Sequence, residues 1–196
     1  MTGALDSNYS SWGFDDPEHA DQQTFRAMVK ALDHPGHPVQ LKSKLSVPGD
    51  LNPASAALLL MLCHGETTVW ADLSWDFPII EWFQCQCGCT LVTEPCMASL
   101  ALITKPSTMP PLEHFRIGDY ERPETASSLI IQVTSLSAAT PMNSTPAVAN
   151  QARLRSPMEE VPAKFWTYWY KQSIRHPPGL DIFFTCDDIL AVLPPF

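Results

Sequence analysis

Three alternating cysteines form the local pattern that offers the most chemistry in this sequence. Cys85, Cys87 and Cys89 are each separated by one residue, and His64 or His114 could approach them in space. Thiolates and imidazoles are common zinc ligands, but zinc knuckles usually separate paired cysteines by about two to four residues so that both sulfurs face one metal. We therefore expect a helix end and turn that accommodates small apolar thiols, and no bound metal. A thiol or metal protein that uses these three cysteines is an alternative.

Other common catalytic patterns do not occur. The eight glycines are never nearer than ten residues to one another, whereas phosphate-binding loops need closely spaced glycines to bring backbone N–H groups near the anion. The G-x-S-x-G pattern of α/β-hydrolases is missing. The six histidines are dispersed, and we expect those beside turns, such as His34 and His37, to be polar surface residues. We predict no catalytic, cofactor-binding or metal-binding residues.

Composition limits the classes of protein and of partner. The 196 residues carry 12 Lys and Arg against 21 Asp and Glu, for a formal net charge of −9. Nucleic acids and anionic membranes attract clustered basic residues, and along this sequence the basic residues are scattered. Residues 1–19 show no secretory signal, and the longest apolar run, 56–63, is shorter than the roughly 18 to 20 residues of a membrane span. We expect a cytoplasmic protein with reduced thiols.

Periodicity and capping residues predict the helices that would position these side chains. A first helix should begin near residue 21, with four apolar side chains spaced i, i+3, i+4 and i+7 on its core face: Phe25, Met28, Val29 and Leu32. A second should follow the N-cap Asn52, with Pro53 at its first position, and should be buried because it is apolar nearly all round. A third should begin at 76–78, and a last one should carry the aromatic residues of 161–170.

Apolar and β-branched runs predict the strands of one sheet. The run at 128–135 should be a central strand buried on both faces. A terminal hairpin should join 180–185 to 189–193. The other expected strands are 39–41, 68–71, 90–93 and 98–104.

The remaining segments predict the domain organisation. Residues 1–19 lack periodicity and are expected to be a flexible tail, whereas 20–196 should form a single domain. Residues 138–158 are rich in Ala, Ser, Thr, Asn and Pro, which favours a long mobile loop. The last helix carries Phe165, Trp166, Tyr168, Trp169 and Tyr170, too many rings for one core-facing stripe, so some should lie at a protein interface.

Several stretches together resemble one family, the PhnH-type subunit of the bacterial carbon–phosphorus lyase system. The first helix and its Pro-Gly turn, 25–36, are similar to the opening of that family. The stretches 51–70, 129–137 and 176–194 are similar to later parts of the family in the same order. The chain departs from the resemblance after the central strand, at 138–141, and beyond the last strand, where similar proteins continue with a basic tail.

The resemblance implies a fold and a function. It implies an α/β domain with a central mixed sheet flanked by helices, similar to a reduced pyridoxal-phosphate-dependent transferase fold without the cofactor. It also implies a cytoplasmic homodimer that joins the other subunits of the carbon–phosphorus lyase core complex in degrading alkylphosphonates. The assembled complex forms ribose 1-alkylphosphonate 5-triphosphate, and the resemblance supplies no catalytic residue for this subunit.

Two enzyme or cofactor alternatives remain open beside this interpretation. A stand-alone pyridoxal-phosphate enzyme would need a lysine placed to form a Schiff base. Lys105, just after an expected strand, is the candidate, although a surface lysine before Pro106 is the simpler interpretation. The thiol or metal protein using Cys85, Cys87 and Cys89 is the other.

Overall fold

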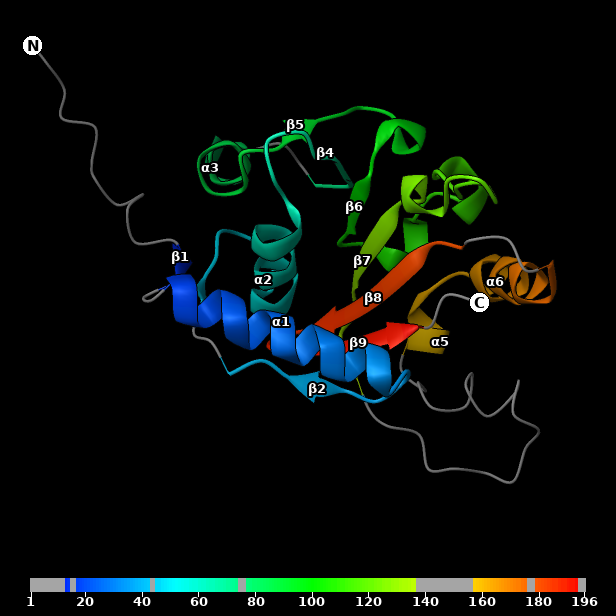
Figure 1. Cartoon of the computed structure of the whole chain (residues 1–196), viewed down its shortest axis with the longest axis horizontal. Coiled ribbons are helices and arrows are strands. Elements are labelled where there is room, and N and C mark those ends of the chain that lie inside the picture. Colours follow the sequence, from blue (N-terminus) through cyan, green and yellow to red (C-terminus); the bar gives the residue numbers. More distant parts are fainter. Residues whose placement is uncertain are drawn as a thin grey trace, which may run out of the picture.

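The computed structural model describes residues 13–14, 17–42, 45–73, 77–136, 157–175 and 179–193 of the chain. It is an α/β structure in which helices cover both faces of a mixed seven-stranded sheet (Figure 1). The expected class, a central mixed sheet flanked by helices, is therefore confirmed. Within these ranges, no helix combines the length and the apolar character that crossing a bilayer would require.

The strands of the large sheet lie in the order β2-β9-β8-β7-β6-β4-β5. From β8 to β5 neighbouring strands are parallel, whereas β9 is antiparallel to both β8 and β2. The central strand is β7, as its apolar run predicts. The strand bounds are β2 Val39–Gln40, β4 Thr68–Ala71, β5 Thr90–Leu91, β6 Leu100–Ile103, β7 Ser128–Gln132, β8 Asp181–Cys186 and β9 Ile189–Leu193.

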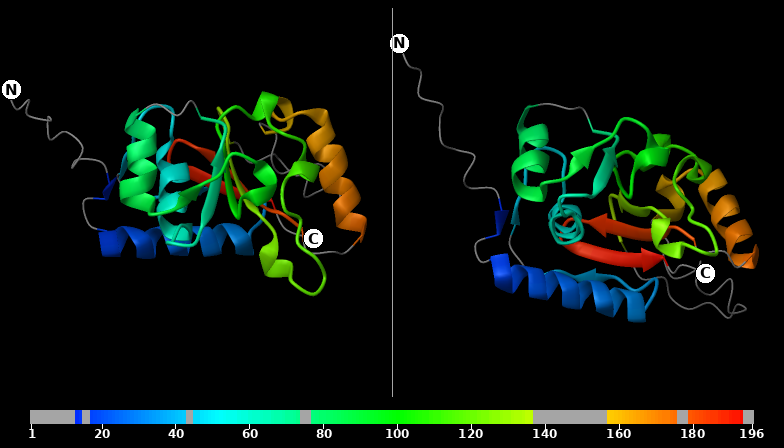
Figure 2. Two further views of the ribbon diagram at one scale, coloured as in Figure 1. Left: turned by 90° about the horizontal axis from the view of Figure 1, so that it is seen from above. Right: turned by 45° about the horizontal axis from the view of Figure 1, so that its top comes forward.

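The helices divide between the two faces of the sheet, as the two views of Figure 2 make clear. One core lies under α1 (Pro17–Asp33), α2 (Pro53–Leu62), α3 (Phe77–Trp82) and the π-helix η2 (Phe83–Cys87). The other lies under α6 (Ala163–Arg175) and the 3₁₀ turn η5 (Leu112–His114). Successive strand residues point to opposite faces, so Leu102 joins the first core and Ile103 the second.

The remaining elements are short. The helix α5 (Pro157–Glu160) and the 3₁₀ turns η3 (Pro95–Met97), η4 (Pro106–Thr108) and η6 (Pro123–Thr125) lie between the larger elements. Two further strands, β1 (Gly13–Phe14) and β3 (Leu45–Ser46), pair antiparallel in a separate sheet. Neither was expected, because a strand of two residues is too short to show an alternating pattern.

The central helix α2 forms for the reasons that its sequence suggests. Asn52 has extended backbone geometry and its Oδ1 accepts a hydrogen bond from the Ser55 N–H at 2.8 Å, while Pro53 takes the first helical position. The six residues from Ala54 to Leu59 are all buried. The expected buried helix is confirmed, although it ends at Leu62, three residues before Gly65.

The expected core face of α1 is wrong. The residues of α1 that contact the core most closely are small, namely Thr24, Ala27 and Ala31. Of the four expected core residues, only Met28 packs against the core, and it does so partly buried. The exposed fractions of the other three are 55% for Phe25, 37% for Val29 and 39% for Leu32. The spacing of the apolar residues therefore predicted the helix correctly, but these residues lie mostly on the side of the helix that faces away from the core.

The aromatic residues of α6 lie mostly inside the structure. Phe165 and Trp169 are buried, and Trp166 and Tyr168 are partly buried against the same core. Trp166 stacks on Phe184 of β8 with ring centroids 6.2 Å apart. Among these residues, Tyr170 alone is a largely exposed ring. The excess of aromatic residues thus builds a broad core, and only a small part of it reaches the surface.

The expected tail and loop fall largely outside the described residues. Helix α1 begins at Pro17, so residues 17–19, which we assigned to the tail, belong to a helix. Most of the remaining tail, 1–12 and 15–16, lies outside the description, as does 138–156 of the expected mobile loop. The end of that expected loop, from Pro157, belongs to α5.

Candidate functional site

The carboxyl ends of the parallel strands define the candidate site. In open α/β sheets, ligands bind where neighbouring strands send their following connections in opposite directions. Here the chain passes from β4 to β5 on one side and from β6 to β7 on the other. The crevice should therefore open between the ends of β4 and β6, which lie side by side in the sheet (Figure 1).

Asp72, directly after β4, links the ends of β4 and β6 where the crevice is expected. Its Oδ1 accepts hydrogen bonds from the Thr104 N–H at 2.7 Å and the Thr104 hydroxyl at 2.8 Å. Its Oδ2 accepts a hydrogen bond from the Lys105 N–H at 2.9 Å. The donors that could hold a bound phosphate at this crevice therefore bind a carboxylate of the chain itself. No amino-acid motif pointed to Asp72, because its donors lie more than thirty residues away.

Lys105, the candidate for a Schiff base, lies at this crevice after β6. Its side chain is exposed, and the contact that ties it to the site is the backbone N–H bond to Asp72. Catalytic lysines gain reactivity from desolvation in an apolar pocket or from a nearby cation. An exposed lysine beside a carboxylate has neither advantage, so the simpler interpretation of a surface lysine is favoured.

A second polar network lies at the carboxyl ends of β7 and β8. The Gln132 Oε1 accepts a hydrogen bond from the Asn52 N–H at 2.8 Å, and its Nε2 donates one to the Asp50 carbonyl at 2.8 Å. The Ser55 and Thr185 hydroxyls are 2.7 Å apart and share a hydrogen bond inside the structure. The amino terminus of α2, a position that often binds anions, is thus tied to side chains of the sheet.

A second carboxylate, that of Glu160, completes this edge of the sheet. The Glu160 carboxylate accepts hydrogen bonds from the Thr134 N–H at 2.8 Å and from the Thr134 hydroxyl at 2.9 Å. Burial raises the pKa of the nearby Cys186 thiol, and the charges of Asp187 and Glu160 raise it further. Cys186 is therefore a protonated thiol at neutral pH and not an activated nucleophile.

The structure does not bring the three alternating cysteines together. Cys85 is exposed on the π-helix η2, Cys87 is buried and Cys89 is half-buried. Instead, Cys87 and Cys89 both approach Cys63 at the end of α2. A hydrogen bond to Cys87 and burial raise the pKa of the Cys63 thiol to about 12, although a hydrogen bond to Cys89 opposes this. A hydrogen bond to Cys63 raises the pKa of Cys89.

These thiols do not form an activated or metal-binding centre. Raised pKa values keep the Cys63 and Cys89 thiols protonated, whereas nucleophilic and metal-bound cysteines are thiolates. Across the part of the chain that the structure describes, no group of three or more His, Cys, Asp or Glu residues is arranged to hold a metal ion. Sequence reasoning missed Cys63 because only the packing of α2 against η2 brings it near the other two.

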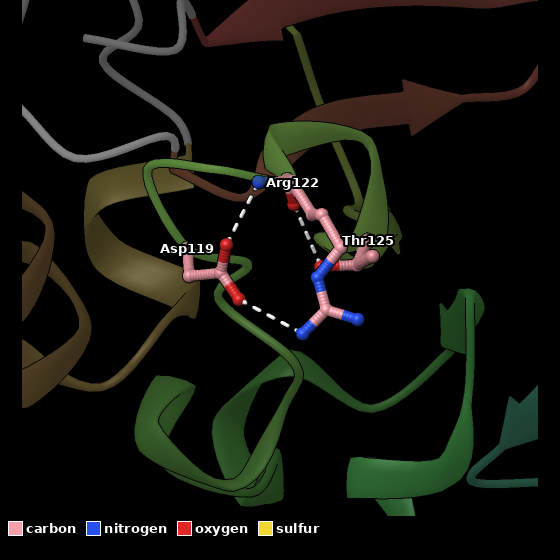
Figure 3. A network of polar contacts seen from close by, with 3 residues as sticks. All are labelled: Asp119, Arg122 and Thr125. Carbon is pink, nitrogen blue, oxygen red and sulfur yellow. Dashed lines mark hydrogen bonds and ion pairs between the residues drawn. The ribbon is translucent and has the colours of Figure 1, made fainter.

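One exposed polar network has a structural role (Figure 3). Asp119 accepts hydrogen bonds from the Arg122 N–H at 2.7 Å and from the Arg122 guanidinium at 3.3 Å. The Thr125 hydroxyl donates a hydrogen bond to the Arg122 carbonyl at 2.8 Å. Because exposed ion pairs contribute little stability, this network mainly shapes the turn that leads into β7.

The geometry describes an α/β protein in which carboxylate and amide side chains of the chain itself occupy the carboxyl ends of the parallel strands. Residues 12–195 match the family described as bacterial phosphonate metabolism protein (PhnH), so this chain belongs to that family. The chain is similar to the alpha-D-ribose 1-methylphosphonate 5-triphosphate synthase subunit PhnH of Rhizobium meliloti (strain 1021). The two are 24% identical over 190 residues, which cover 96% of this chain and 94% of the relative. The family inferred from the sequence is confirmed.

Proposed function

We propose that this chain is an accessory, non-catalytic subunit of the carbon–phosphorus lyase core complex and is required for alkylphosphonate catabolism. The observation that carries the proposal is the similarity to a synthase subunit over nearly the whole length of both chains. In this function, the assembled complex forms ribose 1-alkylphosphonate 5-triphosphate, and the partner subunits supply the reacting groups. The chain contributes to the assembly and has no turnover of its own.

The closed edge of the sheet supports an accessory role. Asp72 and Gln132 take up the donors and acceptors that a substrate would need at the strand ends. The thiols of Cys63, Cys89 and Cys186 have raised pKa values, which disfavours nucleophilic catalysis by them.

We extend the proposal to the organisation of the protein. Residues 20–196 would form one domain, a reduced version of the pyridoxal-phosphate-dependent transferase fold without its cofactor. One sheet that serves both cores supports the single domain. The protein would work in the cytoplasm, which six free cysteines support because disulfides are rare there. It would form a homodimer when alone and join the other core-complex subunits.

Growth on phosphonate tests the proposed function. An in-frame deletion should abolish growth on methylphosphonate as the sole phosphorus source and leave growth on phosphate normal. Purified protein should not transform ATP plus methylphosphonate, but adding it to the other subunits should restore the assembly and its activity. Normal growth of the deletion strain on methylphosphonate, with no duplicate gene present, would contradict the proposal.

A matched pair of substitutions separates loss of the fold from loss of a surface residue. Leu59→Asp places a charge at a fully buried position of α2 and should cost more than about 4 kcal/mol, enough to unfold the subunit and reproduce the deletion. Met97→Asp introduces the same charge at an exposed apolar position and should support growth.

A further inference from the structure

A groove with an unusual charge lies between α1 and the edge strand β2, far along the sheet from the candidate site. The helix and the strand run side by side at the edge of the sheet (Figures 1 and 2). The groove between them has a volume of about 490 Å³, within the range of roughly 300 to 1,000 Å³ that is typical of small-molecule sites.

Helix α1 supplies one wall of the groove. Gln23, Arg26 and Lys30 line it, and their spacing of three and four residues places them on one face of the helix. The buried Ala27 lies between them. Its small side chain leaves room between the longer polar side chains of the same wall.

The edge strand supplies the opposite wall. Val39 is buried, whereas Gln40 and Lys42 are exposed. The Gln40 amide donates a hydrogen bond to the Asp188 carboxylate at 3.0 Å. Lys42 lies two residues farther along the chain, so the two walls together carry three basic side chains and two amides.

Among the described residues, no ion pair within 4.0 Å engages the basic residues of the groove. No Asp or Glu is among the described residues that line the groove, although the Asp188 carboxylate lies 3.0 Å from the Gln40 amide. The ion pair formed by the described residues, Arg122 with Asp119, lies in a different region. Asp33 follows Lys30 on α1, yet it forms no such pair. A quarter of the 12 Lys and Arg of a chain with net charge −9 therefore converges on one groove.

Such a groove suits a ligand with several negative oxygens. Arg and Lys side chains donate hydrogen bonds and accept none, and the planar guanidinium matches phosphate oxygens in a bidentate manner. A cleft lined with one sign of charge also concentrates ions of the opposite sign. At the strand ends the Asp72 carboxylate already accepts the hydrogen bonds of the Thr104 and Lys105 N–H groups, so an anionic ligand of this chain would be bound elsewhere.

We propose that the groove between α1 and β2 binds the oligophosphate group of a nucleoside triphosphate or of a ribose 5-triphosphate. This inference rests on the proposed function, in which the complex converts one such compound into another. The groove recognises the oligophosphate group that these compounds share. The protein holds this group near the partner subunits and does not transform it.

Binding of simple phosphate compounds to the purified full-length protein tests the proposal. Sodium tripolyphosphate and ATP, titrated by calorimetry at low ionic strength, should both bind, and inorganic phosphate should bind at least about tenfold more weakly because it makes fewer charged hydrogen bonds. Equal affinities for tripolyphosphate and ATP would indicate that the phosphate chain alone is recognised. Tighter binding of ATP would indicate that the nucleoside adds contacts.

A matched pair of double variants locates the site. Arg26→Gln with Lys30→Gln should weaken tripolyphosphate binding by about tenfold or more. Lys164→Gln with Lys171→Gln removes the same charge from exposed positions of α6 and should change the affinity by less than about twofold. Circular dichroism should give the same melting temperature for both, since all four side chains are exposed.

Three outcomes would overturn the proposal. One is no binding of tripolyphosphate or ATP by the folded protein up to millimolar concentration. Another is an equal loss of affinity in both double variants, which would indicate a diffuse charge effect. The third is that the groove variant loses binding to the partner subunits while the wild type binds no oligophosphate, which would assign the groove to an acidic protein segment.

The growth assay is independent, so phosphonate growth of the deletion strain would contradict the proposed function while leaving measured phosphate binding intact.

Discussion

At the scale of single residues, Asp72 shows how a short side chain can join two strand ends. Its carboxylate spans the gap between β4 and β6 and accepts hydrogen bonds from Thr104 and Lys105. A glutamate would be one methylene too long for the same backbone donors. An asparagine would turn a donor toward them. The position therefore requires an aspartate for structure alone, apart from any ligand.

Replacing Asp72 should be costly although the residue is only partly buried. Asp72→Ala leaves the Thr104 and Lys105 N–H groups without their acceptor, and we expect the free energy of unfolding to fall by about 2 to 4 kcal/mol. Urea denaturation followed by circular dichroism measures this. Glu121→Ala, at an exposed carboxylate, should change stability by less than about 0.5 kcal/mol. Equal stability of the two variants would contradict the structural role of Asp72.

Residues of this kind could not be predicted from the sequence. Asp72 and Thr104 lie 32 residues apart and are joined only when β4 and β6 pair in register. The proximity of Cys63 to Cys87 and Cys89 could not be predicted for the same reason, because those two thiols come from a different part of the chain, in and just after η2. The three basic residues of the groove are scattered in the sequence, and Lys42 lines the same groove as Arg26 only because β2 packs beside α1.

At the scale of elements, capping residues and apolar runs predicted the helices and strands that depend on local sequence. The Asn52-Pro53 cap and the apolar run after it determine α2, and the terminal hairpin formed as β8 and β9. The orientation of α1 was not predictable, because its inner face consists of Ala27, Ala31 and Thr24, which carry a weak hydrophobic signal. Small residues allow the helix to approach α2 and β9 closely, and this packing outweighs the stronger apolar period on its outer side.

The turn that follows η5 provides an element-scale prediction. Gly118 has a φ of +75°, and an added Cβ would lie 3.1 Å from the Pro123 carbonyl oxygen and 3.2 Å from Ala126. Gly118→Ala should therefore lower the free energy of unfolding by about 1 to 3 kcal/mol, through backbone strain and crowding. Thermal and urea unfolding measure the loss.

A second glycine provides the control for this prediction. An added Cβ at Gly65 meets no atom within 4 Å, and its φ is outside the strained positive range. Gly65→Ala should therefore leave stability nearly unchanged or raise it by up to about 1 kcal/mol. If Gly118→Ala is as stable as Gly65→Ala, the turn does not require the positive φ.

At the scale of the whole molecule, the resemblance carried information that periodicity could not. Runs of apolar residues predicted most strands of the sheet, but they do not specify which strands are neighbours. The order β2-β9-β8-β7-β6-β4-β5 depends on crossovers between distant segments. The match to the family over residues 12–195 identifies the class of protein. The resemblance depends on the order of several sequence blocks, because no single block is specific for the family.

The exposed apolar residues of α1 alter the basis of the proposed homodimer. The sequence predicts that some aromatic rings of the last helix lie at a protein interface, but Phe165 and Trp169 are buried in the core. Phe25, Val29 and Leu32 instead form a stripe on the outer side of α1 at a spacing of four and three residues. In a twofold dimer, the stripes of two copies could pack against each other as identical surfaces.

The last prediction tests this interface in solution. The wild-type protein should be a dimer by light scattering at micromolar concentrations, and Phe25→Glu with Leu32→Glu should convert it to a monomer, because the charges would be buried against their own copies. The melting temperature of the double variant should lie within a few degrees of that of the wild-type protein diluted until it is monomeric, since both side chains are exposed on the single chain. Tyr120→Glu, which adds a charge at another exposed aromatic position, should remain dimeric. A wild-type monomer, or a dimer that survives both substitutions in α1, would show that this stripe does not mediate self-association.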